Sequence, residues 1–231
     1  MTSHASRLAR RDLLRTLAAG GTVAASAALL GGCGTTTQQT QPAALPPASP
    51  TGTLVMITRH GEKPAGSGTP QGIDVNGTPD AHSLTVRGWT RAGALVELFA
   101  PGTGATRPGL ARPTAIYAAG GTGGEGQRPR ETVTPLATRL GLSVNTQYTK
   151  GGEAALAKEV AGRLGPTLIC WQHGEIPAIA AAFGQVTPAP PAAWPDNRFD
   201  LIWVLTPRAD GWTFSQIPQL LLDGDSDQPI S

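Results

Sequence analysis

The chain has 231 residues, only 15% of them charged, and its 18 lysines and arginines against 16 aspartates and glutamates give a formal net charge of +2. Four arginines fall in residues 1–32, so the rest of the chain is close to neutral and lacks the basic excess typical of nucleic-acid-binding proteins. The 30 glycines and 21 prolines exclude a coiled coil, and two cysteines are too few for a disulfide scaffold or a four-thiolate zinc site.

The N-terminal segment, residues 1–32, has the pattern of an export signal. Four arginines precede an uncharged stretch that is too short and too weakly apolar for a comfortable membrane span. A basic segment followed by a short apolar one is typical of a signal peptide, and the pair Arg10-Arg11 resembles a twin-arginine signal. The Leu-Gly-Gly that precedes Cys33 resembles the lipobox of bacterial lipoproteins, in which the cysteine is lipidated. We therefore expect an exported, periplasmic protein held at the extracytoplasmic side of the cell membrane by a lipid on Cys33.

Composition then divides the remaining chain into three parts. Residues 33–52 carry no charge and almost no large apolar side chain, which predicts a flexible tether. Residues 53–218 are predicted to form the folded domain. Residues 219–231 form an acidic tail, which we expect to be frayed.

Apolar runs alternate with helical patterns through the predicted domain. The patterns predict strands at 53–58, 114–118, 142–148, 166–171 and 201–205, with 212–217 forming a hairpin with the last, and helices at 85–99, 129–140, 153–164 and 175–183. Strands that alternate with helices favour a three-layer α/β/α sandwich around a mostly parallel sheet with crossover connections. In such sheets the functional site lies beyond the carboxyl ends of the strands.

Histidines and arginines follow three of these predicted strands. Arg59 and His60 come after the first, Arg128 after the second and His173 after the fourth. Together they would form a cationic pocket, in which the planar guanidinium fork of arginine matches phosphate oxygens. A histidine can attack phosphorus if the attacking nitrogen is neutral, which requires the other ring nitrogen to donate to a carbonyl or carboxylate.

Four motifs in order carry a resemblance to a known family. They are Arg-His-Gly-Glu-Lys-Pro at 59–64, Leu-Thr-Val-Arg-Gly-Trp-Thr-Arg-Ala at 84–92, Arg-Pro-Arg-Glu-Thr at 128–132 and His-Gly at 173–174. This ordered set, spanning residues 53 to about 206, resembles the histidine phosphatase superfamily and implies its phosphoglycerate mutase-like fold.

The resemblance also implies roles for individual side chains. His60 would be the nucleophile that becomes phosphohistidine. Arg59 and Arg128 would hold the phosphoryl oxygens, and His173 would complete the pocket. Glu131 and Thr132 would belong to the structural start of a helix.

The sequence leaves the proton donor open. Glu175 lies two residues after His173, and Glu153 follows a Gly-Gly pair in the middle region, where one branch of the family carries its acid. Glu62 lies nearest to His60 in the sequence. Arg130 is a rival to Arg128 as phosphate ligand, although its spacing favours a place on the helix surface.

Other site types are disfavoured. The Gly-x-Gly-x-x-Gly string at 121–126 lacks the acidic residue that a dinucleotide site requires at the end of the next strand, so we interpret it as a loop. His60, His82 and His173 form no close ligand pair, so we expect no metal and no cofactor. Cys170 lies in an apolar run and is predicted to be buried and inert.

Two functions remain in view. The first is an exported phosphatase that hydrolyses a phosphomonoester, on a small molecule or a peptide, through phospho-His60. The second is a catalytically silent lipoprotein that binds a phosphorylated ligand in the same pocket. In both cases the membrane contact is the lipid anchor alone and no nucleic acid is expected, while the substrate and the oligomeric state stay open.

Overall fold

The computed structural model describes residues 53–231, so the predicted signal peptide, the tether and Cys33 lie outside the described residues. The chain divides into two units, Met1–Leu45 and Pro46–Ser231, and the described residues all belong to the second. Among the helices of that part of the chain, none is both long enough and apolar enough to cross a membrane.

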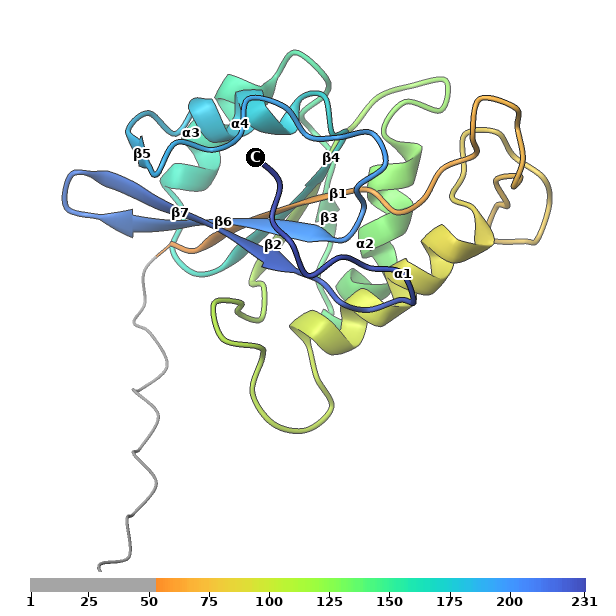
Figure 1. The fold of residues 1–231 in the computed structure, drawn as a ribbon, viewed down its shortest axis with the longest axis horizontal. Helices are drawn as coiled ribbons and strands as arrows, with labels where there is room; N and C mark the ends of the chain where they lie inside the picture. Colours follow the sequence, from red (N-terminus) through yellow and green to blue (C-terminus); the bar gives the residue numbers. More distant parts are fainter. Residues whose placement is uncertain (1–52) are drawn as a thin grey trace, which may run out of the picture. The chain divides into compact units, whose positions relative to one another are not determined.

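A seven-stranded mixed sheet forms the centre of the described domain (Figure 1). Its strand order is β3-β2-β4-β1-β6-β7-β5. Four neighbouring strands, β3, β2, β4 and β1, run parallel, whereas β6 pairs antiparallel with both β1 and β7. The strands are β1 Val55–Arg59, β2 Ala115–Ala118, β3 Val144–Asn145, β4 Thr167–Trp171, β5 Val186–Thr187, β6 Leu201–Arg208 and β7 Gly211–Pro218.

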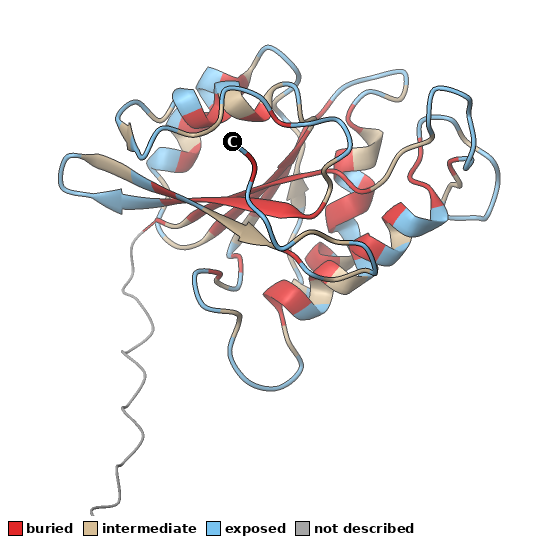
Figure 2. Ribbon diagram, in the orientation of Figure 1, coloured by how far each residue is buried: buried red, intermediate tan, exposed pale blue. Residues whose placement is uncertain are grey.

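Helices cover both faces of this sheet, as the alternation of side chains on β1 requires. Val55 and Ile57 face a core built with α3 and α4, whereas Met56 faces a second core built with α1 and α2. Figure 2 shows the buried residues on the central strands and on the inward sides of the helices. The helices are α1 Val86–Phe99, α2 Gln127–Leu140, α3 Glu153–Ala161 and α4 Ile176–Ala181.

These elements confirm the predicted three-layer α/β/α class with a mostly parallel sheet. The third predicted strand, 142–148, is much shorter than expected, because only Val144–Asn145 pairs with β2 at the sheet edge. The sequence did not predict β5, whose two residues are too few to give an alternation pattern. The hairpin of β6 and β7 is present and longer than predicted.

The loop after β1 is fixed by a close backbone approach to the start of α1. Thr85 caps this helix by accepting a hydrogen bond from the Gly88 amide at 3.2 Å. A Cβ atom on Gly88 would lie 2.5 Å from the Glu62 carbonyl oxygen, and one on Gly61 would lie 2.9 Å from the Gly88 carbonyl oxygen. Only glycine allows this approach, which holds the residues after His60 against α1.

The acidic tail is packed against the domain, so the expectation that it is frayed is wrong. The Asp225 carboxylate accepts hydrogen bonds from the buried Arg91 guanidinium at 2.7 and 3.1 Å. Glu62 pairs with the same guanidinium at 2.8 Å, and Ile230 is buried in the core on the α3 side of the sheet. A buried arginine needs charged partners, and the tail supplies one of them.

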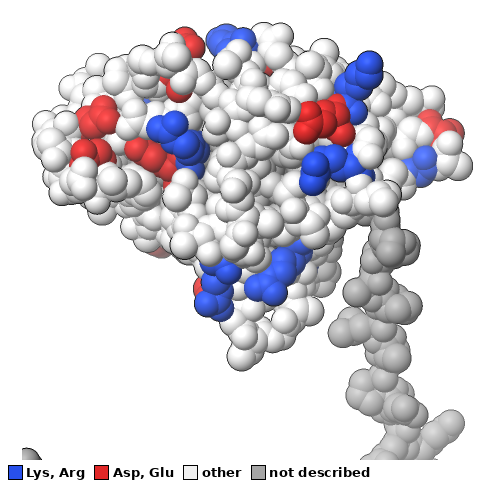
Figure 3. Space-filling model, turned by 180° about the vertical axis from the view of Figure 1, so that it is seen from behind, with Lys and Arg blue, Asp and Glu red and all other residues white. Residues whose placement is uncertain are grey.

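Charged side chains are sparse on the molecular surface. Figure 3 shows one face, on which acidic and basic residues lie in small separate groups among mostly uncharged atoms. This pattern agrees with the low charged fraction of the sequence.

The tail contact predicts an effect on stability. Asp225→Ala removes one carboxylate partner of buried Arg91 and is expected to lower the free energy of unfolding by about 3 kcal/mol. Asp227→Ala is the matched control, because the Asp227 carboxylate lies at an exposed contact with Gln228. Urea unfolding of both variants measures the difference, and equal losses would contradict a structural role for Asp225.

Candidate active site

His60 lies directly after β1, with its side chain only 4% exposed. Its backbone amide donates to the Trp171 carbonyl at 3.1 Å, which ties it to the neighbouring strand β4. Nδ1 of the ring lies 2.7 Å from the Gly61 carbonyl oxygen. Because a carbonyl can only accept, Nδ1 carries the proton and the lone pair of a neutral ring is on Nε2.

The surroundings of His60 oppose its protonation. Burial, together with the positive charges of Arg59, Arg128 and Lys63, lowers the pKa of His60 to about 3, against the opposing effect of the Gly61 hydrogen bond. His60 is therefore neutral at any pH near 7, which is the state in which an imidazole nitrogen can act as a nucleophile.

Thr132 connects the His60 loop to the start of α2. Its hydroxyl accepts a hydrogen bond from the Gly61 amide at 2.8 Å and donates one to the Arg128 carbonyl at 2.7 Å. The neighbouring Glu131 accepts from the Ser83 hydroxyl at 2.7 Å and from the Leu84 amide at 3.0 Å. These contacts give both residues the structural place that the family resemblance implied.

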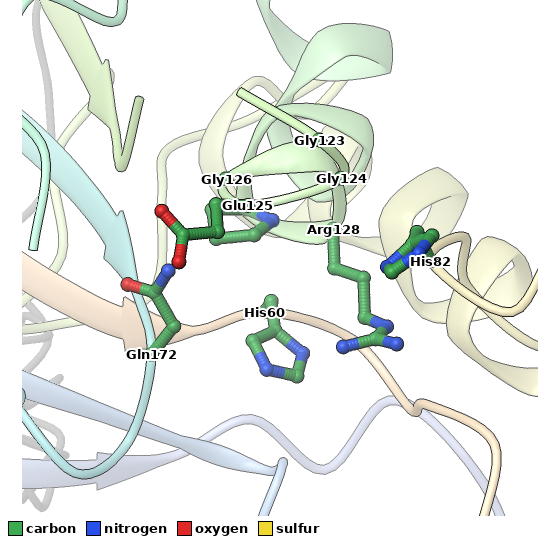
Figure 4. A pocket seen from close by; sticks show the side chains of 9 residues that line it. His60, His82, Gly123, Gly124, Glu125, Gly126, Arg128 and Gln172 are labelled. Carbon is green, nitrogen blue, oxygen red and sulfur yellow. The ribbon is translucent and has the colours of Figure 1, made fainter. Parts of the chain in front are cut away.

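A cavity of about 220 Å³ opens beside His60. Figure 4 shows the Arg128 guanidinium on one side of His60, with Glu125 and Gln172 on the other. Arg128 is oriented by donation to the Ala81 carbonyl at 2.6 Å and to the Ser83 carbonyl at 3.3 Å. The cavity is lined by His60, His82, Gly123, Gly124, Glu125, Gly126, Arg128, Pro129 and Gln172.

Arg130, the rival of Arg128, lies elsewhere. It is exposed and lines a separate surface pocket with Asp74 and Trp89. Of these two arginines, Arg128 is the one that the structure brings to His60.

Arg59 is fully buried and holds the segment that precedes β6. Its Nη1 atom donates to the Asp196 and Arg198 carbonyls at 2.5 and 3.1 Å, and its guanidinium carbon lies 3.8 Å from the centre of the Phe199 ring. Burial lowers the pKa of Arg59 to about 10, although the Asp196 carboxylate opposes that shift. The His60 ring also faces Phe199, with 6.2 Å between ring centres, so Arg59 and His60 share this neighbour.

One carboxylate oxygen, Oδ1 of Asp196, meets three basic side chains. It lies 3.0 Å from Nη2 of Arg59, 3.1 Å from Nζ of Lys63 and 3.3 Å from Nε2 of His173. The hydrogen bond from Lys63 is the main cause that holds the pKa of Asp196 below its ordinary value. Arg59 and His173, both predicted to bind phosphate, therefore contact the Asp196 carboxylate of the chain itself.

Burial, followed by the charge of Arg59, lowers the pKa of His173. At neutral pH, His173 therefore contributes a hydrogen-bonding ring to this cluster, and the positive charge comes from Arg59 and Lys63.

The three carboxylates considered as proton donors have other partners. Glu153 accepts from the Trp171 indole at 3.2 Å and from the Gly151 amide at 3.1 Å. Glu175 pairs with Lys150 at 2.5 Å, and Glu62 with Arg91 and Arg87. None of the three lines the cavity beside His60, whereas Glu125 does.

Sequence reasoning missed four side chains near His60. Asp196 and Gln172 belong to no recognisable motif. Lys63 lies within the first motif but was given no role, and Glu125 was interpreted as part of the glycine-rich loop. The position of Glu125 within a Gly-x-Gly-x-x-Gly string directly after a strand was the available signal.

Cys170 is buried, and burial raises the pKa of its thiol, in keeping with the predicted inert role. Among residues 53–231, no group of three or more histidine, cysteine, aspartate or glutamate side chains is arranged to hold a metal ion.

Comparison with known proteins gives structural likenesses only, since no family model and no curated protein matches the chain. The chain is similar to mycobacterial glucosyl-3-phosphoglycerate phosphatase in complex with VO3, with 18% identity and a TM-score of 0.46 over 71% of this chain and 97% of that one. It is also similar to the protein histidine phosphatase SixA complexed with tungstate, with 16% identity and a TM-score of 0.45 over 72% and 97% of the two chains. At these identities and scores, an assignment of activity has to come from the side chains of the site.

The burial of His60 predicts a dependence of stability on pH. The folded pKa, about 3, lies below the ordinary value of 6.5, so between these values the unfolded chain takes up a proton that the native state does not. Stability should therefore fall as the pH falls through this window. Between pH 6.5 and 4.5 the wild type should lose up to about 2 kcal/mol more than His60→Gln, at up to about 1.4 kcal/mol per pH unit. Denaturant unfolding at both pH values measures this, and equal losses in the two proteins would contradict a buried neutral His60.

The cluster on Asp196 predicts an effect on anion binding. Asp196→Asn removes the negative charge that occupies Arg59, Lys63 and His173, so vanadate should bind more tightly, by about tenfold if the carboxylate costs about 1.4 kcal/mol. Asp210→Asn is the control, because Asp210 pairs with Arg208 at the β6–β7 turn. Calorimetric titration with vanadate gives both constants, and weaker binding to Asp196→Asn would mean that Asp196 positions these side chains.

Proposed function

We propose that this chain is a histidine-type phosphatase that hydrolyses a phosphomonoester through a phosphohistidine intermediate on His60. One observation carries the proposal: a buried, neutral His60 has its Nδ1 proton bound to the Gly61 carbonyl and lines a cavity with Arg128. This is the arrangement that a histidine needs in order to attack phosphorus. The ordered motifs around it place the chain, on this proposal, in the histidine phosphatase superfamily.

The reaction would proceed in two steps. In the first, the lone pair of Nε2 forms a bond to phosphorus while the bond from phosphorus to the leaving oxygen breaks, and the alcohol departs with a proton. In the second, water attacks phosphohistidine, orthophosphate leaves and neutral His60 is restored. The Gly61 carbonyl stabilises the positive charge that the ring acquires as Nε2 bonds to phosphorus, because it accepts from Nδ1 in both states.

On this proposal, Arg128 contacts the phosphoryl group directly, because it lines the cavity beside His60. Burial is the main cause that lowers the pKa of His60, and the charges of Arg59, Arg128 and Lys63 lower it further. The same positive charges stabilise the equatorial oxygens of a transferring phosphoryl group. The Asp196 side chain, 67% exposed, would turn outward when a phosphate takes its place between Arg59 and His173, with no change in the buried core.

We further propose that the protein acts outside the cytoplasm, tethered by a lipid on Cys33. The support is the succession of a twin-arginine-like segment, an uncharged apolar stretch and Leu-Gly-Gly-Cys in the sequence. Its phosphorylated substrate, a small molecule or a peptide, would then be met at the outer side of the membrane.

A second candidate is a silent binding protein that captures a phosphorylated ligand without turning it over. The engagement of Glu62, Glu153 and Glu175 with other side chains favours it, because a leaving alkoxide needs a proton donor. Binding of vanadate without turnover of any phosphomonoester would select this candidate.

The proposed function predicts the consequence of removing His60. His60→Ala should lower kcat on an aryl phosphate by about 10⁴-fold or more, since the nucleophile is lost. With ³²P-labelled substrate, wild-type protein stopped during turnover should carry label that is stable in base and labile in acid, and His60→Ala should carry none. Full activity in His60→Ala, or acid-stable label, would contradict the mechanism.

A further inference from the structure

We propose that Glu125 is the proton donor of this site and that the natural substrate is an alkyl phosphomonoester. This inference rests on the proposed function. It assigns the acid that the sequence left open to a residue on the glycine-rich loop between β2 and α2, outside the three positions considered from the sequence.

Glu125 lies at the cavity beside His60. Its side chain lines the same cavity as His60 and Arg128. Figure 4 shows its carboxylate on the side of His60 opposite to the Arg128 guanidinium, facing the cavity together with the amide of Gln172. A phosphate bound at His60 and Arg128 would therefore have a carboxyl group at a third side, where a leaving oxygen can receive a proton.

The glycine-rich loop holds Glu125 in place. The Glu125 amide donates to the Thr122 carbonyl at 3.2 Å, and the Gln127 amide donates to the Gly124 carbonyl at 3.3 Å. A Cβ atom on Gly121 would lie 2.6 Å from Cβ of Glu125, at a φ of +143° that only glycine adopts readily. Glycine at this position therefore allows the backbone to fold closely around Glu125.

The Glu125 carboxylate is accessible to a ligand in the cavity. Within residues 53–231 the Glu125 carboxylate makes no hydrogen bond or ion pair, and it is exposed to the cavity and to solvent. Glu153 accepts hydrogen bonds from the buried Trp171 indole and from the Gly151 amide, and Glu175 pairs with Lys150. Asp196 faces three basic side chains, which favour its charged form and make it a poor donor.

The chemistry balances with Glu125 in both steps. In the first, Nε2 of His60 bonds to phosphorus, the bond from phosphorus to the leaving oxygen breaks and the Glu125 carboxyl gives its proton to that oxygen. In the second, the Glu125 carboxylate takes a proton from the water that attacks phosphohistidine.

This role also selects the substrate class. An alkoxide is a poor leaving group and gains most from an acid, whereas an acidic phenol or a phosphoanhydride gains little. A carboxylic acid positioned beside the leaving oxygen therefore favours the hydrolysis of alkyl phosphomonoesters, such as those of sugars, polyols and serine or threonine side chains.

The test compares two leaving groups in one variant. In Glu125→Gln, kcat/KM for glycerol phosphate should fall by about 10²–10⁴-fold, because general acid catalysis is lost. For 4-nitrophenyl phosphate the first step should be nearly unchanged, so a burst of nitrophenol and accumulation of phosphohistidine are expected. Glu97→Gln, an exposed substitution on α1 outside the cavity, is the matched control and should behave as wild type on both substrates.

Failure of this inference can be told from failure of the proposed function. The assignment of Glu125 would be overturned if Glu125→Gln lowered kcat/KM equally for the two substrates. It would also be overturned if Glu153→Gln or Glu175→Gln, instead of Glu125→Gln, lowered kcat/KM for glycerol phosphate selectively. In either case the enzyme would remain a phosphatase. A wild-type protein without activity on either substrate would overturn the proposed function itself.

Discussion

The site depends on one interaction, the hydrogen bond from Nδ1 of buried His60 to the Gly61 carbonyl. It fixes the proton on one nitrogen of the ring and leaves the other free for chemistry. Burial, followed by the charges of the surrounding cations, makes a second proton unfavourable, so the ring stays neutral where an exposed histidine would be charged. Neighbouring elements hold His60 and Gly61 in position for this hydrogen bond. The Trp171 carbonyl of β4 accepts from the His60 amide, and the Thr132 hydroxyl accepts from the Gly61 amide. The close approach of α1 fixes the loop that follows.

The positive charges near His60 are partly neutralised by a carboxylate of the same domain. Asp196 supplies a negative charge to Arg59, Lys63 and His173 from an exposed loop, and the same loop accepts the Arg59 guanidinium through its carbonyls. The arrangement gives both terminal nitrogens of the fully buried Arg59 oxygen partners from an exposed loop, without placing the Asp196 carboxylate in the core. On the proposed function, a phosphate ligand would compete with this internal carboxylate, which would favour ligands with more than one negative charge.

The sequence was sufficient for the layered fold and for the meeting of His60 and Arg128 at one cavity, because the ends of parallel strands meet at one edge of the sheet. Arg59, expected beside them as a phosphate ligand, is the last residue of β1 and is fully buried against the loop before β6. The sequence was insufficient for Asp196, which comes from a proline-rich loop between β5 and β6, and for Glu125. Both residues reach the site because of the conformation of their loops, which no hydrophobic periodicity in the sequence predicts. The tail was also misjudged, since its acidic composition resembles a solvated end while Asp225 in fact pairs with buried Arg91. Long-range charge pairing of this kind is invisible to any local pattern.

The most direct test of this account is the protonation state of His60 itself, read by ¹⁵N NMR of histidine-labelled protein across acidic and neutral pH. The account predicts a neutral ring with the proton on Nδ1 and a free lone pair on Nε2 down to a pH of about 4, consistent with a pKa of about 3. A ring that becomes protonated near pH 6.5, or a neutral ring with its proton on Nε2, would contradict the claim that His60 is poised as a nucleophile.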